Sequence, residues 1–157
     1  MYTLQPLLRI RTMREDRAAG ELTAARQALV AAEETLAARR RELEDFEATK
    51  DERRDSIYAA VMGRTVSREQ LDMVTEGVAR IDEEGALKAD NVVRADAERQ
   101  KCEEGVETAR VNLNVATKNR MKIDEHRAVW LTEEAKAEEA RAEGELEDFT
   151  VRKEEIR

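Results

Sequence analysis

The sequence predicts an all-α protein that folds as a long antiparallel two-helix coiled-coil hairpin with a short helical element at its tip. Apolar residues recur every seven positions in two long segments, as in coiled coils. One proline and six glycines leave few places to turn, and 41% charged with 3% aromatic residues disfavour a wide globular core. We expect a single elongated domain over residues 1–157, with arm 1 at about 4–62, the tip at about 63–85 and arm 2 at about 86–152.

The first arm carries the clearest repeat. Leucines recur every seven residues, and a companion row of small residues completes a coiled-coil seam that Arg39 interrupts. These two rows are Leu22, Leu29, Leu36 and Leu43, and Ala18, Ala25, Ala32 and Phe46. The seam weakens at about residues 50–54 and resumes at Ile57. An amphipathic helix on a larger core is the alternative, but no other segment offers such a core.

The centre of the chain contains a helix boundary. Gly63 suits the left-handed conformation that ends helices, so the first arm should stop near Met62. Ser67 followed by Gln70 fits a capping box, which predicts the start of a new helix. We interpret residues 67–84, which Gly77 and Gly85 interrupt, as a short tip element. The alternative is that they form the first turns of the return helix.

The second arm carries a weaker seam. Its apolar positions are Val92, Ala95, Val106, Ala109, Leu113, Ala116, Ile123 and Trp130. Arg120 and Arg127 also fall on seam positions, where their methylenes can cover the seam while the guanidinium reaches water. Segments 4–62 and 86–146 have nearly equal lengths, so both termini should meet at the end away from the tip.

Composition also limits the cellular context and the class of partner. The formal net charge of −8 disfavours broad binding to nucleic acid, which requires lysines and arginines against phosphates. The single Cys102 cannot form an internal disulfide, which favours a reducing compartment. The first residues lack the apolar core of a signal peptide, and no segment has the roughly 20 apolar residues of a membrane span. We expect a cytoplasmic protein without direct membrane insertion.

Catalytic chemistry finds little support in the residues present. His126 and Cys102 are the only histidine and cysteine, so no metal cluster can be assembled without arbitrary carboxylates. We interpret His126 as a helix-surface residue and Cys102 as a seam filler. No phosphate-binding loop of the GxxxxGK[ST] type occurs. We therefore predict a non-enzymatic protein with no catalytic residues, no cofactor and no metal.

Two parts of the chain carry more apolar or charged residues than a two-helix seam can absorb. Near the N-terminus these are Leu4, Leu7, Leu8, Ile10 and Met13, and at the tip they are Val66, Leu71, Met73 and Val74. Some should contact a partner. Residues 1–20 carry a net charge of +2 and residues 131–157 a net charge of −5. These charges either set the antiparallel register or form an arginine-rich surface for an acidic partner.

The layout resembles a known family. The N-terminal pattern of Leu7, Leu8, Ile10, Arg11, Arg14 and Glu15, an interrupted centre and a return helix rich in Glu, Arg and Ala are similar to the YscO family. Its members are central stalk proteins of bacterial type III secretion systems and are related to the flagellar FliJ proteins. The resemblance implies a coiled coil like that of the rotary-ATPase γ subunit.

The resemblance also implies partners and contact residues. One end would enter the pore of a hexameric secretion ATPase through Leu8, Arg11, Arg14, Arg152 and Lys153. The tip would reach the cytoplasmic ring of the export gate through Leu71, Met73, Val74 and Val78. The stalk would couple ATP hydrolysis to gate opening, escort secretion chaperones and hydrolyse nothing itself. It would work at the cytoplasmic face of the inner membrane.

Two other functions stay open on the sequence alone. The first is a generic coiled-coil scaffold or tether, which would favour a dimer in solution. The second is a helix that lies on membranes or nucleic acid, for which only residues 4–17 have a suitable basic and apolar face.

Overall fold

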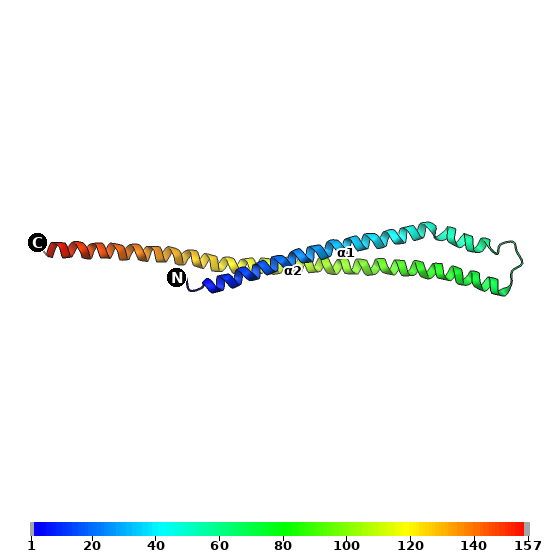
Figure 1. Ribbon diagram of the computed structural model, residues 1–157, viewed down its shortest axis with the longest axis horizontal. Helices are drawn as coiled ribbons and strands as arrows, with labels where there is room; N and C mark the ends of the chain where they lie inside the picture. Colours follow the sequence, from blue (N-terminus) through cyan, green and yellow to red (C-terminus); the bar gives the residue numbers. More distant parts are fainter. Residues whose placement is uncertain (1, 156–157) are drawn as a thin grey trace. The chain divides into compact units, whose positions relative to one another are not determined.

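In the computed structural model, two long helices pack antiparallel against each other, which confirms the predicted all-α hairpin (Figure 1). The structure describes residues 2–155, with side chains for residues 2–146. Helix α1 spans Gln5–Ala59 and α2 spans Arg68–Glu155, and the described residues contain no strand. Contacts divide the chain into two units. Unit 1 joins the residues up to Leu22 to those from Ala109 onward, and unit 2 is Thr23–Thr108. A single elongated domain stays a prediction.

Unit 2 contains the turn between the helices. Gly63 has a φ of +69°, a conformation that glycine adopts without strain. The Val61 and Met62 amides both donate to the Tyr58 carbonyl, so α1 tightens and ends at Ala59, three residues before the predicted stop. The Ser67 amide donates to Gln70 Oε1 at 2.9 Å, and the Gln70 amide donates to Ser67 Oγ at 3.3 Å. The predicted capping box is confirmed.

The tip segment is not separated from the return helix. Helix α2 runs unbroken from Arg68 through Gly77 and Gly85, as the alternative interpretation expected. Both glycines face α1 and make room for large side chains. A Cβ at Gly77 would lie 3.3 Å from Ile57, and one at Gly85 would lie 2.8 Å from the Phe46 ring. Their role is close packing between helices, and they do not end a helix.

The core of each unit follows the predicted seams. In unit 2, Ala32, Leu36 and Phe46 of α1 are buried, as are Val74, Ile81 and Ala95 of α2. In unit 1 the buried residues are Tyr2, Leu8, Ala18, Leu22 and Ala109. The core is thin, since even Ile81 keeps 4% of its surface exposed. Where the first seam weakens, ion pairs replace apolar contacts: Arg53 lies 2.8 Å from Glu84, and Arg54 pairs with Asp82.

The two helices differ in length, with 55 residues in α1 and 88 in α2. The expectation of nearly equal arms was therefore wrong. In unit 1, Tyr2 packs against Trp130, and α2 continues to Glu155 without an α1 partner beside it (Figure 1). The sequence explains the difference, because the apolar seam ends at Trp130. The following seam positions are Glu134, Ala137, Arg141 and Gly144.

Candidate partner-binding surfaces

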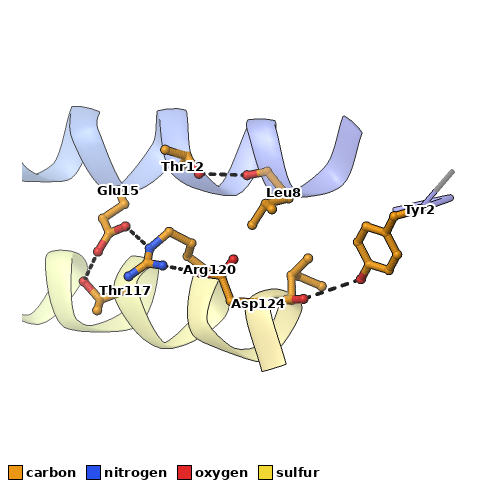
Figure 2. A network of polar contacts seen from close by, with 8 residues as sticks. Tyr2, Leu8, Thr12, Glu15, Thr117, Arg120 and Asp124 are labelled. Carbon is orange, nitrogen blue, oxygen red and sulfur yellow. Dashed lines mark hydrogen bonds and ion pairs between the residues drawn. The ribbon is translucent and has the colours of Figure 1, made fainter. Parts of the chain in front are cut away.

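Tyr2 anchors the start of the chain to α2 in unit 1. Its side chain is buried, and its hydroxyl lies 2.9 Å from Nδ1 of His126. The hydroxyl also donates to the Ile123 carbonyl oxygen at 3.4 Å, the bond drawn from Tyr2 in Figure 2. Its ring lies 5.4 Å from that of Trp130 in a tilted arrangement that aromatic pairs favour. The sequence patterns did not identify this anchor, because a residue before the helix has no periodicity.

Glu15 joins the two helices through a polar network. The Thr117 hydroxyl donates to Glu15 Oε1 at 2.8 Å, and Arg120 Nε donates to Glu15 Oε2 (Figure 2). Nη1 of the same guanidinium donates to Asp124 Oδ2. The bond from Thr117, with help from Arg120, lowers the pKa of Glu15 below its ordinary value of 4.5, although desolvation opposes the shift. The hydrogen bond that Arg120 donates to Glu15 raises the pKa of Arg120.

This network predicts a specific pH dependence of stability. The folded-state pKa of Glu15 is depressed, so its stabilising contribution is fully present above the ordinary value of 4.5 and is lost as the pH falls below that value. We expect Glu15→Gln to lower the thermal unfolding midpoint at neutral pH. The midpoint of the wild type should then fall more steeply than that of the variant between about pH 5 and pH 3. Thermal melts followed by circular dichroism across this range test the prediction, and parallel curves would contradict it.

The N-terminal surface, defined as Leu8, Arg11, Arg14, Arg152 and Lys153, is only partly described. Leu8 is buried against α2, Arg11 is half-buried and Arg14 is exposed on α1. Nε of Arg11 is buried and has no hydrogen-bond partner among the described residues. Arg152 and Lys153 belong to the end of α2, well beyond Trp130, where Tyr2 packs, so the helix does not bring them beside Arg11 and Arg14. Their side chains lie outside the described residues. Leu8 therefore packs between the two helices and is not available to a partner, whereas the two arginines are at least partly accessible.

The tip surface, defined as Leu71, Met73, Val74 and Val78, lies in the first turns of α2. Leu71 and Met73 are 53% and 64% exposed, whereas Val74 is buried and Val78 is half-buried. Met73 and Val74 line a shallow groove with Val61, Val66 and Gln70. Met62 in the turn is 74% exposed, and sequence reasoning did not include it. Its position next to the helix-ending Gly63 was the available signal.

His126 and Cys102, the residues that the sequence offered for catalysis or metal binding, make ordinary side-chain contacts. His126 contacts Tyr2, and the half-buried Cys102 thiol lies 4.0 Å from a carboxylate oxygen of Glu98. Within the described residues, no three histidine, cysteine or acidic side chains gather as a metal site would require. The same part of the chain contains no helix with the length and apolar character of a bilayer span.

Comparison with known proteins identifies the family. The family model described as "Type III secretion protein YscO" matches residues 4–152. The fold is similar to the solved structure of a YscO homolog, CT670, from Chlamydia trachomatis, with a TM-score of 0.70 and 24% sequence identity. That match covers 94% of this chain and 90% of CT670. No curated protein matches the sequence significantly. The family match spans almost the whole chain, and on that basis this protein belongs to the YscO family and is a component of type III secretion.

Proposed function

We propose that this protein is a non-enzymatic stalk that links the hexameric secretion ATPase to the cytoplasmic ring of the export gate. Family membership supports the general part of the proposal, a structural component with partners inside the secretion apparatus. The specific partners rest on two surfaces that the hairpin leaves available. The N-terminal surface belongs to unit 1 and the tip surface to unit 2, so one chain can hold two partners at separate sites.

One observation supports the proposal most strongly. A two-helix hairpin has no third layer, so the apolar side chains that face away from the seam stay in water. Leu71 and Met73 at the tip and Met13 near the N-terminal surface are all more than half exposed. Such residues become buried when a partner binds, and exposed apolar side chains of this kind are typical of interaction sites.

The ATPase contact is assigned to the cationic part of the N-terminal surface. Arg14 is exposed and Arg11 is half-buried, and neither side chain forms an ion pair with a described residue, so both are available to carboxylates of a partner. The complementary surface would be an acidic lining of the ATPase pore. Arg152 and Lys153 would extend this contact along α2.

The gate contact is assigned to the apolar tip surface. Leu71 and Met73 would insert into the cytoplasmic ring, while Val74 and Val78 hold the first turns of α2 against α1. Met73 suits this role because its unbranched side chain adapts to irregular surfaces. The protein would act at the cytoplasmic face of the inner membrane and would also escort secretion chaperones.

Reversal of the two arginines tests the ATPase contact. We expect Arg11→Glu/Arg14→Glu to reduce retention by the immobilised secretion ATPase at least roughly tenfold, because two attractive contacts become repulsive. The matched control is Arg40→Glu/Arg41→Glu, which makes the same charge change at two exposed residues of α1 in unit 2. The control should bind like the wild type. Undiminished binding by Arg11→Glu/Arg14→Glu, with a native circular dichroism spectrum, would remove these arginines from the contact.

A further inference from the structure

A belt of charged side chains crosses the seam of unit 2 on the way to the turn. It consists of five residues that we call the ionic clasp: Lys50, Arg53 and Arg54 of α1, and Asp82 and Glu84 of α2. Arg53 lies 2.8 Å from Glu84. Lys50 lies 3.8 Å from Asp82, and Arg54 pairs with the same carboxylate oxygen of Asp82. These side chains keep between 31% and 49% of their surface exposed, so water and salt reach every pair.

The ionic clasp interrupts the apolar core on the α1 side. Residues 47–56 of α1 contain no apolar residue larger than alanine, over a length of about 15 Å. Phe46 packs against Gly85 before this stretch, and Ile57 packs against Gly77 after it. The segment from residue 55 to residue 81, which we call the tip hairpin, is therefore joined to the rest of unit 2 mainly through charged side chains.

The core of the tip hairpin is small. Only Val74 and Ile81 are buried in it. Its buried and half-buried side chains are all β-branched and favour a helix less than leucine does, whereas the core of α1 before the clasp contains Leu36 and Phe46. A segment with few buried contacts opens at a lower free-energy cost than the rest of its unit. The β-branched side chains are those of Ile57, Val61, Val66, Val74, Val78 and Ile81.

We propose that the ionic clasp controls a local opening of the tip hairpin, in which the remainder of unit 2 stays folded. Each exposed ion pair contributes little, and salt screens it further, so the clasp holds a weakly packed segment only loosely. Opening makes Val74 and Ile81 accessible. The use of this opening at the export gate rests on the proposed function, because Val74 can contact the ring only once it leaves the seam. The opening itself is a property of the chain alone.

Backbone hydrogen exchange, measured by mass spectrometry on the full chain, tests the opening. Amides of residues 72–81 report on the tip hairpin, and those of residues 29–46 serve as the reference within unit 2. After correction for intrinsic exchange rates, we expect the tip amides to exchange at least roughly tenfold faster than the reference at low salt. Addition of about 1 M NaCl should accelerate the tip by a further factor of roughly three relative to the reference.

Charge reversal distinguishes the ionic clasp from simple fraying near a turn. Lys50→Glu/Arg54→Glu should accelerate exchange at residues 72–81 at least roughly tenfold, because both partners of Asp82 then repel it. The reference amides should not change, since the rest of unit 2 stays folded. Addition of Asp82→Arg restores opposite charges and should bring the tip to within roughly threefold of the wild type. The control Arg40→Glu/Arg41→Glu makes the same charge change at two exposed residues of α1 and should leave the tip unchanged.

Three results would each overturn the proposal. The first is exchange of the tip amides as slow as that of the reference, and the second is a salt effect of equal size in both segments. The third is exchange that Asp82→Arg fails to slow in the Lys50→Glu/Arg54→Glu background. These measurements need no partner protein. Loss of the gate contact with the exchange results intact would therefore remove the proposed function and leave the ionic clasp in place.

Discussion

Replacement of Phe46 by alanine is expected to lower the free energy of unfolding by about 3 kcal/mol, the typical cost of removing a buried phenylalanine. Phe46 is only 5% exposed, and its ring lies against Gly85 of α2. The guanidinium of Arg53 lies 5.5 Å from the ring centroid, within the range of a cation–π contact. The thin core of unit 2 has no neighbouring layer that could fill the resulting gap. Urea unfolding followed by circular dichroism measures the change.

Gly85→Ala provides the sharpest check of this contact. An alanine Cβ would lie 2.8 Å from Phe46 Cε1, so we expect the substitution to destabilise the wild type by about 1 kcal/mol. In the Phe46→Ala background the clash is gone, and the better helix propensity of alanine should then stabilise the protein by about 1 kcal/mol. Gly105→Ala is the matched control, because a Cβ there meets nothing within 4 Å. It should stabilise both backgrounds, and an equal effect of Gly85→Ala in both would contradict the packing.

Local signals in the sequence predicted the helix boundary well. Ser67 and Gln70 form the capping box, and Gly63 adopts the positive φ that ends a helix. Both features depend on residues a few positions apart, so no knowledge of the rest of the fold was needed. The heptad rows likewise identified Leu22, Leu36 and Phe46 as buried.

The glycines of α2 show where local reasoning failed. Gly77 and Gly85 looked like interruptions because glycine is a poor helix former. Their purpose becomes visible only when Ile57 and Phe46 are placed opposite them. The sequence of α2 alone contains no information on which side chain of α1 each glycine meets.

The register between the helices was also beyond the sequence patterns. A shift of seven residues preserves a coiled-coil seam, so the heptads alone do not pair Glu15 with Thr117 and Arg120. Arg120 was expected to cover the seam with its methylenes, and the structure adds an ion pair with Glu15 that ties unit 1 together. The same register determines which residues of α2 Tyr2 contacts, and how far α2 extends beyond the start of α1.

Among the predicted partner-contact residues, the structure separates exposed from buried ones. Leu71 and Met73 are exposed while Val74 is buried one position further along, because successive helical residues point about 100° apart. Leu8 is likewise buried while Arg14 is exposed. Assignment of residues to a partner surface from the sequence cannot make this distinction until the direction of the seam is known.

Bridging of two partners by one chain is the central claim of the proposed function, and a three-component pull-down tests it most directly. The secretion ATPase is immobilised, and the cytoplasmic ring of the export gate is added with or without this protein. We predict that the ring is retained only when the protein is present. The variant Leu71→Ser/Met73→Ser should bind the ATPase like the wild type. The amount of ring that it retains should be at least roughly tenfold lower.

The matched control for this measurement is Val30→Ser, which removes an apolar side chain of unit 2 that is 53% exposed, as Leu71 is. This variant should retain as much of the ring on the immobilised ATPase as the wild type does. Retention of the ring without this protein, or full retention with Leu71→Ser/Met73→Ser, would contradict the proposed stalk.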